Sequence, residues 1–173
     1  MIRVQIRKLQ PRDLDALAPE LAALLIDAVD GGASVGFLPP LDPARAEEYW
    51  VGLAPELQSA RRIVLVAQLK ERLVGTVQLA LAPQENGTHR ANVQRLIVHR
   101  SARRQGIGQA LMHAAESFAK ETGRTLLLLD TRKGEPAESL YAKLGYRRVG
   151  EVPGYARGGD GGVHPSVFFF RTL

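Results

Sequence analysis

Three arginines and two glycines crowd into one short turn near the middle of the chain, in the segment RSARRQGIGQ. Gly106 and Gly108 carry no side chain, so a ligand can approach the backbone amides there closely. The first N–H groups of a helix lack internal acceptors and create a positive potential that suits an anion. Arg103 and Arg104 can add charge-assisted hydrogen bonds. The turn therefore predicts a phosphate or pyrophosphate site.

Two common nucleotide-binding motifs do not fit this segment. A dinucleotide-binding turn requires a third glycine in G-x-G-x-x-G, and Leu111 occupies that place. The ATP-type motif G-x-x-x-x-G-K-[ST] does not occur in the sequence. A basic helix start that is simply solvated remains the alternative to an anion site.

A strand–helix–strand unit must position the turn. The segment ANVQRLIVH predicts a strand before it, and apolar spacing predicts a helix from Gln105 to Glu121 that Gly123 ends. The continuous apolar segment TLLLLDT is typical of a strand buried on both faces. Asp130 lies at its end, where ligands gather in open α/β sheets, and burial there would raise its pKa.

The remaining segments predict an α/β (α+β) fold with a mixed, mostly antiparallel sheet and helices on both faces. Lys70-Glu71 suits a tight hairpin turn, and PQENGTH contains the Asn-Gly signal of another. The other predicted strands are Ile2–Leu9, 61–69, 72–82, 146–155 and 166–173, and the other helices are Leu14–Val29, a single helix from Asp42 or Pro43 through Leu57, and Ala137–Leu144.

A loop of about 13 residues, DGGASVGFLPPLDP, separates the first two helices. Loops of this length are usually functional or disordered. Disorder is not expected here, because Val35, Phe37 and Leu38 would prefer burial. We expect Ser34–Leu38 to cover a site where a substrate binds.

Composition and charge narrow the function classes. At 173 residues, 1–173 are expected to form a single domain. The net charge is +5, but the basic residues are scattered, so no nucleic-acid partner is expected.

The absence of cysteine excludes a thiol nucleophile and agrees with a cytoplasmic protein. Without an apolar run of about 20 residues, no membrane association is expected. His99 and His164 lack a second ligand at metal spacing, so no metal is expected.

Two separated motifs resemble one enzyme family. Arg103-x-x-Gly106-x-Gly108 is similar to the acyl-CoA pyrophosphate loop of the GCN5-related N-acetyltransferase (GNAT) family, which follows a strand and opens a helix. The later LYAKLGY resembles that family's LYxKxGF signature. The likeness covers the whole chain in topology and is most specific from Val93 to Gly150.

The resemblance implies acetyl-CoA as cosubstrate. Backbone amides of the turn would hold its pyrophosphate, and the strand before the turn would pair with its pantetheine arm. Two parallel strands must then part to admit the arm, and the amide of Ile97 or Val98 would polarise the thioester carbonyl. The implied cofactor-binding residues are Leu96, Ile97, Val98, Arg103, Arg104, Gln105, Gly106, Ile107, Gly108 and Tyr141.

Two residues are candidates for proton transfer. Tyr141 matches the family tyrosine whose phenol lies near the sulfur, and a phenol with pKa about 10 can protonate a thiolate; packing in the core is its alternative role. Asp130 could contact the acceptor or act as the base, or cap the next turn. Many family members carry a carboxylate near the position of Asn92, and an amide cannot accept a proton at neutral pH. Asp130 or a chain of water molecules would then act as the base, or the acceptor differs from the acceptor of those family members.

The acceptor is predicted to be a small-molecule amine. The segments GGASVGF, LLLDT and VGEVPGY resemble family members that acetylate an amino-acid toxin, which suggests an amino-acid-like antibiotic and a resistance role. Transfer would be direct, in a ternary complex. The alternatives are a non-enzymatic acyl-CoA-binding regulator and a protein or peptide N-acetyltransferase; a homodimer is also considered. The expected substrate-binding residues are Ser34, Val35, Phe37, Asn92, Asp130 and Tyr155.

Overall fold

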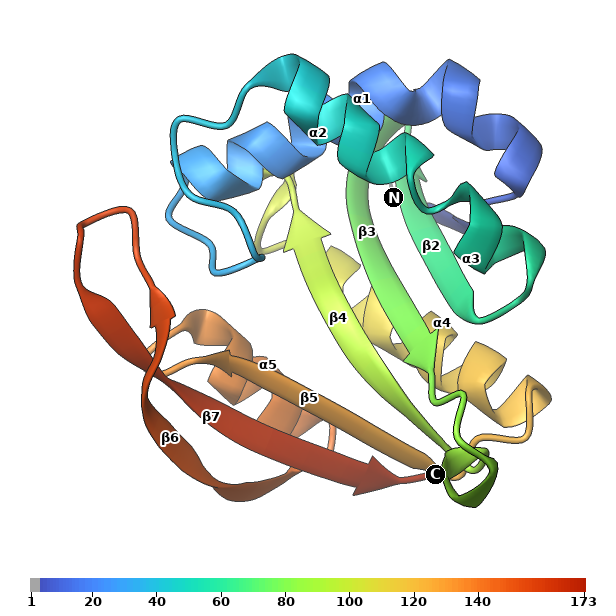
Figure 1. Ribbon diagram of the computed structural model, residues 1–173, viewed down its shortest axis with the longest axis vertical. Coiled ribbons are helices and arrows are strands. Elements are labelled where there is room, and N and C mark those ends of the chain that lie inside the picture. The colour runs from blue at the N-terminus through green and yellow to red at the C-terminus, as the bar shows by residue number, and fades with distance from the viewer. Residues whose placement is uncertain (1–3) are drawn as a thin grey trace.

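One seven-stranded sheet runs through the part of the chain that the computed structural model describes, residues 4–173. Its strand order is β1-β2-β3-β4-β5-β7-β6, and only β4 and β5 are parallel neighbours (Figure 1). The strands are β1 (Gln5–Lys8), β2 (Arg62–Leu69), β3 (Arg72–Leu81), β4 (Arg90–Val98), β5 (Leu126–Arg132), β6 (Arg147–Arg157) and β7 (Val163–Thr172). The helices are α1 (Leu14–Asp30), α2 (Pro43–Val51), α3 (Ala54–Gln58), α4 (Ile107–Glu121) and α5 (Pro136–Lys143). The predicted mixed sheet is confirmed.

Helices cover the two faces of the sheet unequally. α1 and α2 lie in front of β2–β4 in Figure 1, while α4 and α5 lie behind the sheet. Two apolar cores result: α1, α2 and α3 pack on one face around the fully buried Trp50, and α4 and α5 pack on the other around Leu111 and Leu127. No helix covers the front of β5, β7 and β6 in Figure 1.

The parallel neighbours β4 and β5 pair only at their beginnings. Their ladder holds three residue pairs and ends at Asn92 and Leu128, whereas β4 stays paired with β3 as far as Val98. Between these points the β3–β4 register shifts, and Arg95 adopts a left-handed φ of 47°. A bulge of this kind bends a strand and increases its twist. The expected parting of the two strands is therefore present.

Several predicted boundaries need correction. The single helix expected through Leu57 is two helices, α2 and α3, because Pro55 has no N–H to donate and its ring would clash with the carbonyl of Val51. The helix expected from Gln105 begins at Ile107, since Gly106 takes a left-handed φ of 78°. The PQENGTH connection is not a tight turn but contains a 3-10 helix, Glu85–Gly87.

Other sequence expectations agree with the structure. Asp42 caps α2 by accepting the N–H groups of Ala44 and Arg45 (2.9 and 3.2 Å). Lys70 and Glu71 form the left-handed β2–β3 turn. The start of the first strand, predicted at Ile2, lies outside the described residues. Within residues 4–173, no helix combines the length and apolarity that crossing a membrane requires.

Gly75 lets α4 pack close to β3. A Cβ at this position would lie 3.0 Å from both Leu111 Cδ1 and the carbonyl oxygen of Ile97, so a larger residue would push α4 away. We expect Gly75→Val to lower the free energy of unfolding by about 1–3 kcal/mol through overpacking, measured by urea denaturation. The control is Gly150→Val in β6, where a Cβ meets no atom within 4 Å. Equal stability of both variants would contradict this packing.

Candidate active site

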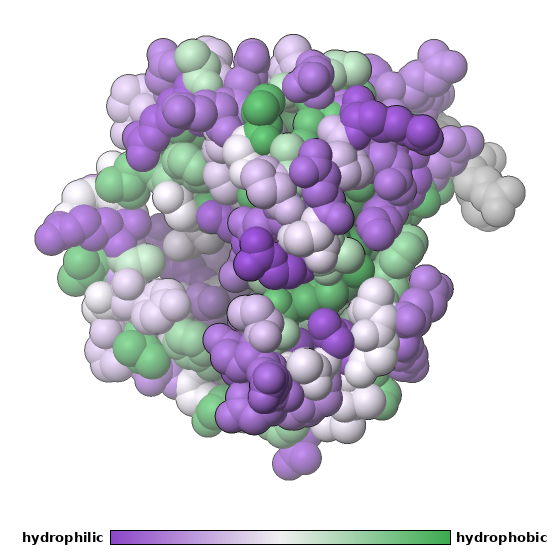
Figure 2. Space-filling view, turned by 45° about the vertical axis from the view of Figure 1, so that its right-hand side comes forward, coloured by the Kyte–Doolittle hydropathy of each residue, from purple (hydrophilic) through white to green (hydrophobic). Residues whose placement is uncertain are grey.

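A cleft of about 1000 Å³ opens where β4 and β5 part. Its walls are the end of β4, the turn before α4, the end of β5, α5, the loop after α1 and the end of β6. Figure 2 shows the surface hollowed on its left side, with hydrophilic residues around the recess. The cleft thus joins the arginine-glycine turn to Asp130 and Tyr141, which are distant in sequence.

The turn before α4 presents a row of free backbone amides. Within residues 4–173, no backbone or side-chain acceptor takes the N–H groups of residues 104–109, and the first bond into the helix is Ala110 N–H to the Gly106 carbonyl (3.0 Å). Arg104 and Gly106 both adopt left-handed conformations (φ 64° and 78°). This arrangement of amides at a helix start suits a phosphate group.

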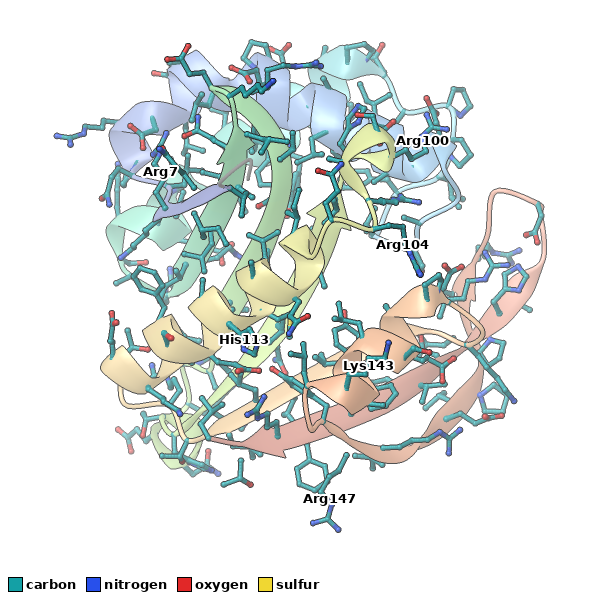
Figure 3. The ribbon with its side chains drawn as sticks, turned by 180° about the vertical axis from the view of Figure 1, so that it is seen from behind. Arg7, Arg100, Arg104, His113, Lys143 and Arg147 are labelled. Carbon is teal, nitrogen blue, oxygen red and sulfur yellow. The ribbon has the colours of Figure 1, made fainter. Side chains whose placement is uncertain are left out.

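Positive side chains surround these amides. Arg103, Arg104 and Lys143 all line the cleft. Figure 3 shows Arg104 on the turn and Lys143 on α5, on opposite sides of the opening between α4 and α5. Nothing acidic lies in the first turn of α4. The amides and the cations together fit a pyrophosphate.

A contact with α1 fixes the other side of the turn. The carboxylate of Asp27 accepts the backbone N–H of Arg100 (2.9 Å) and its side-chain Nε–H (2.8 Å). Partial burial acts to raise the pKa of Asp27, but these hydrogen bonds outweigh it and the pKa is lowered. Asp27 therefore stays ionised at neutral pH and ties the end of β4 to α1.

The exposed edge of β4 offers backbone groups to the cleft. His99 donates its N–H to the Val74 carbonyl of β3 (2.8 Å). Alternate residues of a strand direct their backbone groups to opposite sides, so the backbones of Leu96 and Val98 face away from β3, toward the cleft. Of the two amides considered for carbonyl polarisation, this geometry favours Val98 over Ile97.

Tyr141 lies on α5 with its ring held among other aromatic rings. The centroids of Tyr146 and Phe169 are each 5.8 Å from it, and Tyr141 is 5% exposed. Burial, with a smaller contribution from the negative charge of Asp130, raises the pKa of the Tyr141 phenol far above its usual value. The phenol therefore keeps its proton at neutral pH, as a proton or hydrogen-bond donor must.

Asp130 lies at the floor of the cleft, on the sheet face opposite Leu127 and Leu129, which are buried under α4 and α5. Solvent in the cleft reaches Asp130, yet the surrounding protein removes part of its hydration and raises the pKa of the carboxyl. A hydrogen bond with Ser166 acts in the opposite direction. A carboxylate with a raised pKa is a better proton acceptor than an ordinary aspartate.

The loop after α1 lines one end of the cleft. Phe37 packs edge-on against Tyr49 of α2 (5.3 Å between centroids). The Arg95 guanidinium lies 4.8 Å from the centre of the Tyr49 ring, and its Nε–H donates to the Val35 carbonyl (3.2 Å). These contacts hold the loop against β4 and α2.

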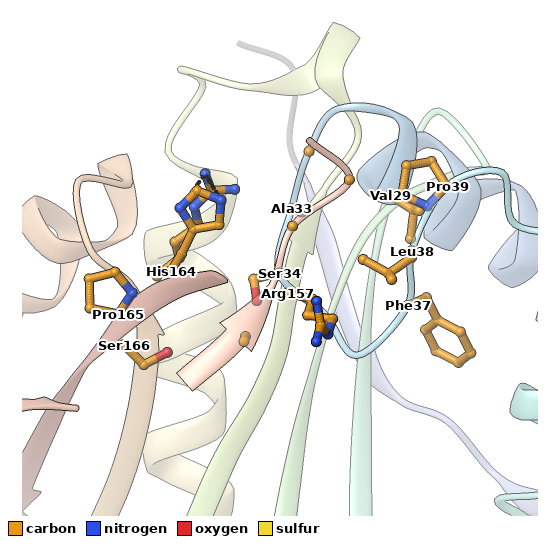
Figure 4. A pocket seen from close by; sticks show the side chains of 15 residues that line it. Val29, Ala33, Ser34, Phe37, Leu38, Pro39, Arg157, His164, Pro165 and Ser166 are labelled. Carbon is orange, nitrogen blue, oxygen red and sulfur yellow. Dashed lines mark hydrogen bonds between the residues drawn. The ribbon is translucent and has the colours of Figure 1, made fainter. Parts of the chain in front are cut away.

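The β6–β7 hairpin approaches the same loop from the other side. Gly159 at its tip lies so close to Pro39 that an added Cβ would be 2.7 Å from the proline ring. A small cavity between them is lined by the loop, Arg157, His164 and Ser166 (Figure 4). Loop and hairpin thus enclose this end of the cleft, which we call the acceptor end.

Most of the predicted site residues come together in the cleft. Those that line it are Ser34, Val35, Phe37, Leu96, Ile97, Val98, Arg103, Arg104, Gly106, Ile107, Gly108, Asp130, Tyr141 and Tyr155. Asn92 is the last residue of β4 that pairs with β5, one residue before the lining begins. Gln105 is exposed on the outside of the turn. Their roles stay predictions.

Sequence reasoning missed three arginines that line the acceptor end: Arg95, Arg132 and Arg157. Arg95 offered a signal, since it is a charged residue inside the apolar strand segment NVQRLIV. Arg132 follows Asp130 by two residues on β5 and therefore shares its face. Arg157 gave no signal, because its place depends on how the β6–β7 hairpin folds back.

Comparisons with solved structures confirm the fold. A GNAT-family acetyltransferase from Streptococcus pneumoniae superposes with a TM-score of 0.80 at 20% identity, covering 99% of this chain and 100% of that one. A protein from Salmonella typhimurium, solved with its cofactor acetyl-CoA, gives a TM-score of 0.78 at 16% identity, covering 99% and 94% of the two chains. At these identities the likeness concerns the fold alone.

Sequence comparisons identify the family. Human N-acetyltransferase 8 is 32% identical over 90 residues, which is 50% of this chain and 39% of that protein. The chain thus matches about two fifths of the length of this relative. The model of the acetyltransferase (GNAT) family matches residues 36–146, which include β4, the amide-lined turn, β5 and Tyr141. The protein therefore belongs to the GNAT family of acetyltransferases.

Proposed function

We propose that this protein is an acetyl-CoA-dependent N-acetyltransferase that acetylates a small-molecule amine by direct transfer in a ternary complex. One observation carries the proposal: a single cleft connects the free amides of residues 104–109 to Asp130 and Tyr141 through the gap between β4 and β5. Transfer from a long acyl-CoA requires a site for its phosphates that is connected to a site where protons can be exchanged, and this cleft connects two such groups of residues. Family membership supports the same activity.

The residues present fit acetyl-CoA. The amides of residues 104–109, with Arg103 and Arg104, would hold the pyrophosphate, and the backbones of Leu96 and Val98 would bind the pantetheine arm. When bound, acetyl-CoA supplies an activated acetyl group as a thioester. The Val98 amide would donate a hydrogen bond to the thioester carbonyl, where negative charge develops.

Asp130 and Tyr141 would handle the protons. The attacking amine must lose a proton, and Asp130 accepts it directly or through water, helped by the raised pKa of its carboxyl. Tyr141 donates a hydrogen bond from its phenol to the departing sulfur, since a phenol pKa raised above that of a thiol disfavours full proton transfer. Its high pKa ensures that the proton is still present at neutral pH. The chain has no cysteine to carry an acetyl group, which supports direct transfer.

The enclosed acceptor end favours a small amine over a peptide. The loop after α1 meets the β6–β7 hairpin, with Gly159 against Pro39, so an extended chain has no open groove to pass through at that point. A resistance role toward an amino-acid-like antibiotic, a cytoplasmic location and a homodimer are compatible extensions of the proposal.

An amine panel tests the proposed function. The protein is incubated with acetyl-CoA and amino acids, polyamines, aminoglycosides or short peptides, and free thiol release is followed. We expect turnover with at least one small amine and none with peptides. Tight acetyl-CoA binding without turnover on any amine would instead favour an acyl-CoA-binding regulator, and turnover with peptides alone would favour a peptide N-acetyltransferase.

A charge placed in the turn tests the cofactor site. Gly106→Glu puts a carboxylate among the free amides, and we expect acetyl-CoA to bind about 100-fold more weakly, measured by calorimetry. Any side chain at φ 78° is strained, so Gly106→Ala serves as the control that carries the strain without the charge. Equal affinities of the two variants would contradict a pyrophosphate at this turn.

The pH dependence of catalysis tests Asp130. Because its pKa is raised, the acidic limb of kcat/KM should lie above the ordinary aspartate range, with activity increasing as the carboxyl loses its proton. Asp130→Asn should remove this limb and lower kcat by about 10²–10⁴-fold. Glu135→Gln changes another carboxylate that lines the cleft and should keep the limb. A limb that persists in Asp130→Asn would exclude Asp130 as the base.

A further inference from the structure

Positive charge exceeds negative charge at the acceptor end of the cleft. Arg95, Arg132 and Arg157 line it, while Asp130 and Glu135 are the only carboxylates among the described residues that line the whole cleft. Glu135 lies at the start of α5 rather than beside the loop and the hairpin. A paired arginine has little left to offer a ligand, so only the unpaired arginines contribute to this excess.

Arg132 is already engaged. Its Nη2 lies 3.0 Å from His164 Nε2 and 3.7 Å from a carboxylate oxygen of Asp160. His164 is in turn bonded to Asp160 at 2.9 Å. These contacts fasten the hairpin tip to β5. Arg132 is therefore best understood as a structural residue of the hairpin.

Arg95 is held in place but not neutralised. It occupies the bulge of β4 at φ 47°, a left-handed conformation that is strained for a non-glycine residue and that clusters at functional sites. Its Nε–H bonds the Val35 carbonyl, and its guanidinium stacks on Tyr49. Within residues 4–173 no carboxylate pairs with it, although it lines the cleft, and one Nη atom lies beside Gly36 of the loop.

Arg157 also lacks a negatively charged partner. Within the described part of the chain it forms no ion pair and no side-chain hydrogen bond, although it lines both the cleft and the small cavity beside the loop. Figure 4 shows its side chain among the residues that line this cavity, and the residue is exposed to solvent. A guanidinium in such a place is available to a ligand.

We propose that the acceptor amine also carries a carboxylate, as an amino acid does, and that Arg95 and Arg157 bind this carboxylate while Asp130 faces the amine. In the sheet order, β4 with Arg95 lies on one side of β5 with Asp130, and β7 and then β6 with Arg157 lie on the other; all three residues line the cleft. Guanidinium groups match carboxylates in geometry as well as charge. An amine without an anionic group would meet only the excess positive charge.

This inference rests on the proposed function, and a matched substrate series separates the two. For each amino acid that is turned over, the corresponding carboxamide and decarboxylated amine are assayed by thiol release from acetyl-CoA. We expect kcat/KM to fall by about 10–100-fold when the carboxylate is lost, as for loss of a charge-assisted hydrogen bond. Equal turnover of all three forms would overturn the carboxylate site and leave acetyl transfer intact. No turnover of any amine would overturn both.

Arginine variants locate the carboxylate. Arg157→Met and Arg95→Met should each raise KM for the amino acid about tenfold or more, with little change in KM for acetyl-CoA or for the carboxamide. Arg72→Met removes the same charge at the exposed start of β3 and is the control. Arg157→Met is the decisive variant. Arg95 also supports the loop, so Arg95→Met can raise KM by disturbing the loop as well as by removing a carboxylate partner.

A binding measurement removes the dependence on turnover. Calorimetric titration of the amino acid in the presence of CoA, which has no acetyl group to transfer, should show weaker binding to both variants than to the Arg72→Met control. Unchanged amino-acid binding in Arg157→Met and Arg95→Met would contradict the proposal.

Discussion

The site depends on the interruption of one hydrogen-bond ladder. β4 and β5 pair through Asn92 and Leu128 and then separate, while β4 keeps its bonds to β3. A sheet normally satisfies its backbone groups in both directions, but beyond Asn92 this edge of β4 has no strand partner, and the Val98 carbonyl instead accepts the Arg103 Nε–H (3.1 Å). The bulge at Arg95 bends β4, and the packing of α4 on Gly75 of β3 holds β4 beside β3. The cleft follows from these constraints.

The groups around the cleft are fixed by contacts outside it. Asp27 ties the end of β4 to α1, so the turn with its free amides starts from a rigid point. Tyr141 is held by Tyr146 and Phe169, and the hairpin by the cluster of Arg132, His164 and Asp160. The free amides at Arg104–Gly106 and the guanidinium of Arg157 belong to exposed residues, so a bound anion would take the place of water at these groups.

Local signals in the sequence predicted most of the residues that line the cleft near the turn before α4, where we propose that acetyl-CoA binds. Glycines and arginines at a helix start, a strand before them and an apolar strand after them are contiguous, so their chemistry could be interpreted without the fold. The acceptor side was predicted only in part. Phe37 and Asp130 stood out by type and position, but Arg95 and Arg157 are brought there by a bulge and a hairpin. The break between α2 and α3 was missed because the apolar spacing continues across Pro55.

The central claim is that acetyl-CoA occupies the gap between β4 and β5 with its pyrophosphate on the turn before α4. The most direct measurement is a titration of ¹⁵N-labelled protein with acetyl-CoA, followed by amide chemical shifts. The account predicts the largest saturable changes at the amides of residues 104–109 and at Leu96 and Val98. Saturable binding that leaves those amides unchanged and shifts others instead would contradict it.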